Sequence, residues 1–92
     1  MSIYFTYVLI SEKDKKLYIG YSTDLKKRIK RHSDGKVIAT RNRRPLKLIH
    51  YEVFINMHNA KNREIFLKSG RGRKQLKSSI HHTLTEFNYK FL

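Results

Sequence analysis

The sequence predicts an α+β fold in which a small three-stranded antiparallel sheet is flanked by helices, in the order β-β-α-β-α-α. Residues 3–10 are almost continuously apolar or aromatic, which is typical of a central strand covered on both faces. Later in the chain, segments with the apolar spacing of helices lie before and after a third strand-like segment. Helices that bury their apolar faces on such a sheet form a layered α+β architecture.

A β-hairpin is expected at the start of the chain. Residues 11–16 are polar and contain a turn-forming aspartate, and residues 17–21 have the composition of a second strand. A helix is expected over residues 24–32, because Asp24 can cap its N-terminus and Gly35 lies just beyond its end.

A basic loop, a third strand and a second helix are expected in the middle of the chain. Residues 36–44 form the loop, which Pro45 closes, and residues 46–55 are typical of a strand. Asn56 can then cap a helix over residues 57–68.

The end of the chain combines a helix break with an aromatic tail. The run Ser69–Arg73 holds two glycines and is expected to end the second helix, before a short helix near residues 74–80. One domain is expected over residues 1–92, with residues 80–92 docking on the core or on a second copy. The tail has helical apolar spacing but strand-like composition, so both structures stay open. Its apolar residues are Ile80, Leu84, Phe87 and Phe91.

The charge of the chain indicates a polyanionic partner. Twenty-one lysines and arginines against seven acidic residues give a net charge of +14 and a pI near 10.3, which is typical of a nucleic-acid-binding protein. The alternatives are a solubilising basic surface or affinity for anionic lipid. There is no cysteine, no signal peptide and no apolar run of about 18 residues, so we expect a cytoplasmic protein that does not enter a membrane.

One acidic residue lies where packing alone would not place it. Glu64 shares an apolar helix face with Ala60 and Leu67, at helical spacing. A carboxylate there needs a partner, which is either a basic side chain or a metal ion. The other acids are scattered, so they cannot form a carboxylate cage for two metals, and no phosphate-binding glycine loop is present.

Four residues of the first half pose similar questions. Arg28 and His32 lie four residues apart on one side of a helix, beside its apolar stripe. Arg28 is either a phosphate ligand or a solvated surface residue, and His32 is either functional or a favourable charge at a helix end. Tyr7 and Tyr18 would share one sheet face if the hairpin paired them directly, either for chemistry or for packing. Direct pairing would centre the turn between residues 12 and 13.

Together these residues resemble the signature of the GIY-YIG nuclease family, over nearly the whole chain. Tyr18-Ile19-Gly20 matches the second half of the signature, and Phe5-Thr6-Tyr7 keeps only the tyrosine of the first half. The ten residues between the two tyrosines match the family spacing. Arg28, His32 and Glu64 stand where the family has its catalytic arginine, a histidine or tyrosine, and its metal-binding glutamate. An asparagine that several members carry has no clear counterpart, although Gln75 or Ser78 would be a substitute.

The resemblance implies a metal-dependent endonuclease that hydrolyses phosphodiester bonds in nucleic acid, with DNA the expected substrate. The chain is most similar to the small single-domain branch related to the nuclease domain of an excision-repair endonuclease, which suggests a role in DNA repair. In this interpretation Glu64 holds Mg²⁺ or Mn²⁺, Arg28 neutralises the phosphate, and Tyr18 or His32 activates the attacking water. The implied catalytic residues are Tyr7, Tyr18, Arg28, His32 and Glu64.

Further residues are expected to contact nucleic acid through its phosphates, without reading sequence. They are Gly20, Lys26, Lys27, Lys30, Arg31, Arg41, Arg43, Arg44, Arg71, Arg73 and Lys74. The protein is expected to be a monomer or a weak homodimer. A non-catalytic nucleic-acid-binding domain with the same fold is the main alternative. A protein-interaction module with the aromatic tail as its contact patch is another.

Overall fold

The computed structural model of the chain describes residues 2–91 and contains one antiparallel sheet. Its strands are β1 (Tyr4–Ser11), β2 (Leu17–Ser22) and β3 (Leu46–Phe54), in the spatial order β2-β1-β3. The predicted α+β class and three-stranded antiparallel sheet are therefore confirmed. The strand predicted to be central is central, because β1 pairs with both neighbours.

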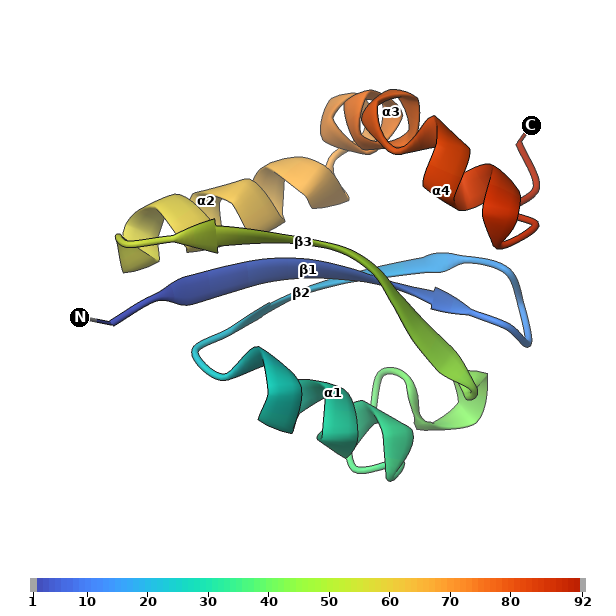
Figure 1. Cartoon of the computed structure of the whole chain (residues 1–92), viewed down its shortest axis with the longest axis horizontal. Helices are drawn as coiled ribbons and strands as arrows, with labels where there is room; N and C mark the ends of the chain where they lie inside the picture. The colour runs from blue at the N-terminus through green and yellow to red at the C-terminus, as the bar shows by residue number, and fades with distance from the viewer. Residues whose placement is uncertain (1, 92) are drawn as a thin grey trace.

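Helices cover both faces of the sheet (Figure 1). Helix α1 (Leu25–Ser33) lies on one face, and α2 (Met57–Lys68), α3 (Gly70–Ser79) and α4 (His81–Glu86) lie on the other. The predicted element order lacks α4 and a single 3₁₀ turn, η1 (Arg41–Arg43), because both are too short for a periodic apolar pattern. No helix within residues 2–91 is long and apolar enough to cross a membrane.

The helix starts follow the predicted caps. The Asp24 carboxylate accepts a hydrogen bond from the Lys27 backbone N–H at the start of α1. The Asn56 side chain likewise accepts from the backbone N–H groups of the first turn of α2. Gly35, just past α1, has a φ of +74°, which a residue with a side chain rarely adopts.

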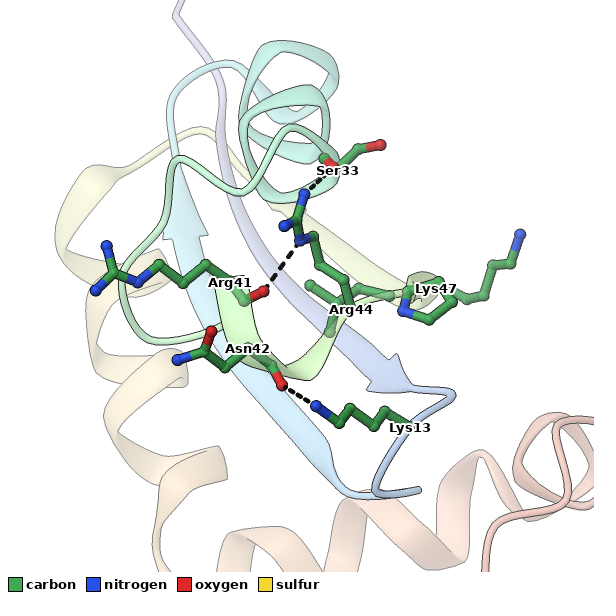
Figure 2. A pocket seen from close by; sticks show the side chains of 8 residues that line it. Lys13, Ser33, Arg41, Asn42, Arg44 and Lys47 are labelled. Atoms are coloured by element: carbon green, nitrogen blue, oxygen red, sulfur yellow. Dashed lines mark hydrogen bonds between the residues drawn. The ribbon is translucent and has the colours of Figure 1, made fainter.

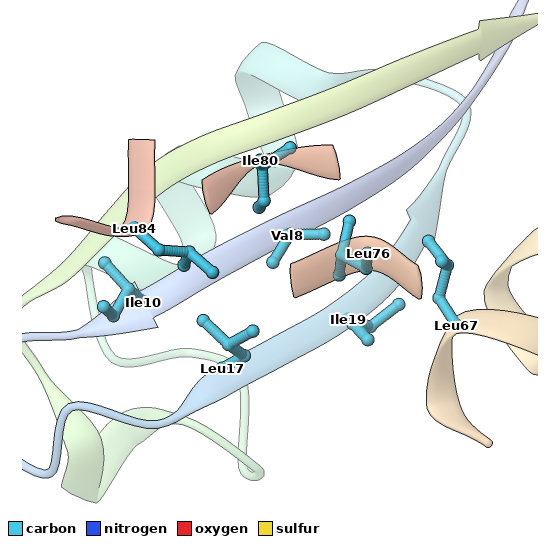
Figure 3. Packing of buried hydrophobic residues seen from close by; sticks show 8 residues of the cluster. All are labelled: Val8, Ile10, Leu17, Ile19, Leu67, Leu76, Ile80 and Leu84. Carbon is cyan, nitrogen blue, oxygen red and sulfur yellow. The ribbon is translucent and has the colours of Figure 1, made fainter. Parts of the chain in front are cut away.

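The apolar core lies between the sheet and helices α2 to α4 (Figure 3). Its buried residues are Val8, Ile10, Leu17, Ile19, Leu67, Leu76, Ile80 and Leu84. Phe87 and Tyr89 pack against this cluster, so the segment after α4 turns back onto the core. The helix ends at Glu86 and Phe91 is 44% exposed, so the helical face suggested by the tail's spacing does not extend to Phe91.

Direct pairing of Tyr7 with Tyr18 is wrong. Tyr7 lies opposite Gly20, and Tyr18 lies opposite Leu9, because the turn extends further along the chain and includes Lys15 with a φ of +61°. The register differs by two residues, and side chains alternate faces with a period of two. Tyr7 and Tyr18 therefore still share one face of the sheet.

The predicted end of the second helix at residue 68 is confirmed, but the break is shorter than Ser69–Arg73, because Ser69 alone separates α2 from α3. The Ser69 hydroxyl accepts from the Gly72 backbone N–H and caps α3. A Cβ atom on Gly72 would lie 1.8 Å from the Phe66 carbonyl oxygen, so this glycine permits close packing of two helices. Arg71 and Arg73 consequently project from a helix and not from a flexible loop.

Candidate active site

On the face of the sheet that carries α1, the ring of a buried tyrosine packs over a glycine. Tyr7 is fully buried, and its ring lies over Gly20, where an added Cβ would approach the phenol to 2.5 Å. The Tyr18 ring lies beside it, with 6.4 Å between the ring centroids. Gly20 therefore has a packing role on this face, and its expected contact with nucleic acid stays a prediction.

A chain of hydrogen bonds runs inward from the Tyr7 hydroxyl. The hydroxyl lies 2.8 Å from His32 Nε2, and His32 Nδ1 lies 2.7 Å from Thr40 Oγ1. His32 is 1% exposed and Thr40 is fully buried. Thr40 was not predicted as a site residue, because no pattern in the sequence indicates that residues 36–44 fold back beneath α1. The two ring contacts of His32, to Tyr7 and Tyr18, fix the plane of the imidazole.

His32 is a neutral residue in this setting. Burial, and secondarily the positive charge of Arg28, lower the pKa of His32 from 6.5 to about 4. A histidine that is uncharged at neutral pH gains nothing from the negative end of a helix dipole. The interpretation of His32 as a charged residue that stabilises the helix end is therefore wrong.

Arg28 is tied to the same chain from the solvent side. Its Nε–H donates to the Tyr7 hydroxyl oxygen over 3.3 Å, and this bond raises the pKa of Arg28 although partial burial opposes it. Burial raises the pKa of the Tyr7 phenol, and the hydrogen bond from Arg28 only partly offsets this. At neutral pH the pair is therefore a guanidinium cation held by a neutral phenol.

Glu64 approaches this cluster from α2. Its charge contributes to the raised pKa of Tyr7, so the carboxylate lies within electrostatic reach of the phenol. The side chain is 22% exposed and accepts a hydrogen bond from Lys68 Nζ over 3.0 Å. The expected basic partner is thus present, but it is a half-exposed lysine one helical turn away that can move.

The donor set at Glu64 suits a metal ion that keeps most of its waters. Within residues 2–91, no cluster of three or more histidine, cysteine or acidic side chains could hold a metal. A single carboxylate is compatible with Mg²⁺, which prefers oxygen ligands and is often bound by one or two carboxylates, water and substrate phosphate. The residues present therefore fit a hydrated Mg²⁺ and not a caged ion.

The surface in front of Arg28 is shallow. A hollow of about 160 Å³ lies between the start of α1 and the end of β2. Its lining residues are Ser22, Thr23, Asp24, Lys27, Arg28 and Arg31. Larger hollows lie elsewhere on the molecule. An open, cationic surface with hydroxyl groups suits one phosphate of a polymer better than an enclosed small molecule.

The basic residues predicted to bind phosphate fall into separate groups. Those on α1 are exposed, namely Lys26, Lys27, Lys30 and Arg31, and two of them, Lys27 and Arg31, line the hollow. Arg43 instead binds Asp14 over 2.7 Å, which holds the pKa of that carboxyl at about 2. Arg71, Arg73 and Lys74 lie on α3, on the sheet face opposite α1 (Figure 1). Of these groups, only the one on α1 shares a surface with Arg28.

Comparisons with known proteins identify the family of this chain. Residues 3–77 match the family described as the GIY-YIG catalytic domain. The UPF0213 protein CPE1444 of Clostridium perfringens is 37% identical over 79 residues, 85% of each chain. The UPF0213 protein YsiG of Lactococcus lactis is 42% identical over 85 residues, 91% of this chain and 81% of that protein. The solution structure of the UPF0213 protein BH0048 from Bacillus halodurans is 37% identical, with a TM-score of 0.52 over 83% of each chain.

Proposed function

The chain belongs to the GIY-YIG catalytic domain family, a family of nucleases, and from this premise we propose that it is a metal-dependent endonuclease that cleaves DNA. The observation that supports the proposal most directly is the fixed position of Arg28. The Arg28 Nε–H donates to the Tyr7 hydroxyl. That hydroxyl is hydrogen-bonded to His32, and His32 is hydrogen-bonded to Thr40. The proposed setting is the cytoplasm, with the protein acting on DNA in repair as a monomer or weak homodimer.

Arg28 would bind the scissile phosphate. Because its Nε–H is occupied by Tyr7, the outer N–H groups of the guanidinium remain for two phosphate oxygens. A cation that is already positioned stabilises the charge that grows on the phosphoryl oxygens without reorganising during the reaction. Lys27 and Arg31, which line the same hollow, would bind the flanking phosphates.

Tyr18 is better placed than His32 to activate water. His32 is 1% exposed and its two ring nitrogens are engaged with Tyr7 and Thr40, whereas the Tyr18 side chain is only partly buried. We assign Tyr18 to orient the attacking water and to take up its proton. The water oxygen then bonds to phosphorus as the bond to the 3′-oxygen breaks. His32 and Thr40 act as positioning residues.

Glu64 would hold the metal ion, Mg²⁺ or Mn²⁺, together with water and a phosphate oxygen. The bound ion would supply positive charge to the leaving 3′-oxygen. The Glu64 carboxylate would exchange its exposed partner Lys68 for this ligand, which costs little because exposed ion pairs of this kind contribute about 0.3–0.5 kcal/mol.

A nicking assay tests the proposal. Supercoiled plasmid is incubated with Mg²⁺ and wild-type protein, with Glu64→Ala, or with Glu86→Ala, which removes an exposed acid from α4 as a matched control. We expect nicking that requires Mg²⁺, is lost in Glu64→Ala and is retained in Glu86→Ala. Nicking that survives in Glu64→Ala would reject the metal assignment.

A non-catalytic nucleic-acid-binding domain is the second candidate. It is favoured by the ion pair between Glu64 and Lys68, which gives the carboxylate a structural partner without any metal. This candidate predicts binding of plasmid without nicking in Mg²⁺ or Mn²⁺, on linear and branched DNA alike.

A further inference from the structure

A second basic hollow lies at the other end of α1 from the Arg28 site. It has a volume of about 570 Å³, and Figure 2 shows the side chains around it. Four of its lining residues are cations, Lys13, Arg41, Arg44 and Lys47, and none of its lining residues is acidic. We call it the basic hollow.

The cation at its centre is held in a fixed position. Arg44 Nε donates to the Arg41 carbonyl oxygen over 3.0 Å, and Nη1 donates to the Ser33 carbonyl oxygen over 3.3 Å (Figure 2). The guanidinium also packs against Gly35, where an added Cβ would come within 2.7 Å of it. Within residues 2–91, its Nη2 group donates to no protein atom, so it remains available to a ligand.

Flexible cations surround this fixed one. Lys13 reaches in from the β1–β2 turn and donates to the Asn42 carbonyl oxygen over 3.1 Å, while Arg41 and Lys47 extend on either side (Figure 2). Lys13, Arg41 and Lys47 are all exposed and make no ion pair within the described part of the chain. A fixed guanidinium with mobile cations around it suits an anion with several oxygens, such as a phosphate group.

Another large hollow with basic lining residues differs in how its fixed arginine is held. It lies against α3 and the end of the chain, and Asp14 is among its lining residues together with Arg43. Asp14 and Arg43 neutralise each other over 2.7 Å. The fixed arginine there is therefore neutralised, although Lys15, Lys16, Arg73 and Lys90 also line that hollow, whereas the fixed Arg44 of the basic hollow is held by backbone carbonyls and keeps its charge.

The basic hollow and the Arg28 site are joined by one row of charges. Arg28 and Ser33, the residue of α1 that lines the basic hollow, are five residues apart, which is roughly 8 Å along the helix or about two nucleotide steps along one strand of a duplex. The exposed residues Lys27 and Arg31 lie along this length, and Lys30 between them is paired with Asp34 over 3.1 Å. Both sites lie on the same side of the sheet.

We propose that the basic hollow binds a backbone phosphate of the substrate strand about two to three nucleotides from the scissile bond. This inference rests on the proposed nuclease function and adds a minimum substrate length to it. A dinucleotide holds a single internal phosphate and does not occupy both sites. Substrates with at least about three nucleotides on that side of the bond gain the second contact.

Binding without cleavage tests this proposal. Fluorescence anisotropy of a labelled 20-base-pair duplex, in EDTA, is compared for wild type, Lys13→Gln/Lys47→Gln and the control Lys77→Gln/Lys90→Gln. The control removes the same charge from α3 and the end of the chain. We expect the hollow variant to bind about tenfold more weakly and to lose about one to two units from the slope of log affinity against log salt. We expect the control to change affinity less than twofold, and Lys13→Arg/Lys47→Arg to bind as wild type.

Two further binding measurements complete the test, one with a short oligonucleotide and one with lipid vesicles. A labelled dinucleotide should bind equally to wild type and the hollow variant, because its single internal phosphate cannot occupy both sites. Equal losses in hollow and control variants, or a hollow defect that persists with the dinucleotide, would overturn the proposal. So would loss of binding to phosphatidylserine vesicles with duplex binding unchanged, which would identify a lipid site. Because these measurements need no cleavage, absence of nicking would reject the nuclease function and leave this phosphate site standing.

Discussion

The two faces of the sheet are built in opposite ways from alternate residues of one strand. On the α2–α4 face, Val8 and Ile10 of β1 pack into an apolar cluster. On the α1 face, Tyr7 of the same strand enters a chain of hydrogen bonds to His32 and Arg28. Tyr7 and Val8 are equally buried, so burial does not distinguish the faces.

The difference lies in what each face requires of its residues. Apolar packing is non-directional and depends on volume and shape. A hydrogen-bonded chain depends on particular atoms, and a buried polar group that loses its partner costs about 1–3 kcal/mol. The α2–α4 face should therefore determine stability, and the α1 face, together with Glu64 on α2, should determine chemistry, which the following substitutions test.

The largest effect on stability is expected from the core. Leu76→Ala removes a side chain that is 1% exposed and should lower the free energy of unfolding by about 2–5 kcal/mol. Nicking per folded molecule should not change, because Leu76 lies on the face opposite Arg28. Urea unfolding and a nicking assay on the same preparation measure both quantities. A loss of nicking at full folding would show that the two faces are coupled.

The largest effect on activity is expected from Arg28. Arg28→Ala should slow nicking by about 10²–10³-fold, because it removes a positioned cation from the scissile phosphate, while the melting temperature changes little. Lys27→Ala, on the same helix and in the same hollow, is the matched control and should slow nicking less than tenfold. Similar losses in the two variants would mean that Arg28 contributes only positive charge.

Substitutions of two glycines, one on each side of the sheet, should distinguish the two faces by smaller effects. Gly72→Ala places a methyl group 1.8 Å from the Phe66 carbonyl oxygen, so backbone must move, with an expected cost of about 1–3 kcal/mol or more in stability. Gly20→Ala meets the end of the Tyr7 ring at 2.5 Å and should displace the phenol from Arg28. We expect Gly72→Ala to lower the melting temperature more, and Gly20→Ala to lower nicking more at a temperature where both are folded. The reverse order would contradict the division between the faces.

The smallest effect is a pH dependence from the α1 face. The folded-state pKa of His32, about 4, lies below its ordinary 6.5, so between these values the unfolded chain binds a proton that the folded chain excludes. The contribution of neutral His32 to the free energy of unfolding is fully present above about pH 6.5. It is lost as the pH falls, by at most about 1.4 kcal/mol per pH unit. Urea unfolding between pH 4.5 and 6.5 measures the slope, which His32→Gln should reduce. This range lies above the titration of Glu52, whose pKa is lowered from 4.5. An unchanged slope would assign the effect to another group.

Much of the fold was predictable because its signals are local. Asp24 and Asn56 mark the starts of α1 and α2, and continuous apolar character marks β1 as the central strand. Ser69 was not recognised as a single-residue link, because glycines at 70 and 72 are usual helix breakers. Only the close approach of α3 to Phe66 explains why a glycine is needed there.

The sequence indicated the residues of the candidate site, but not the hydrogen bonds that link them. Tyr7, Tyr18, Arg28 and His32 follow from the spacing of the family signature, and the structure brings these four together. Thr40 could not be found, because its role depends on a loop that folds back beneath a helix.

The amino-acid sequence by itself determined the order of strands and helices, the excess of positive charge and the residues of the family signature. These properties depend on composition and on spacing along the chain. The tertiary structure alone decided that Tyr7 lies on Gly20, that His32 is uncharged, and that Arg43 is neutralised whereas the basic hollow is not. Each of these depends on which distant groups come within a few ångströms, and hydrogen bonding, desolvation and charge pairing act only at that range.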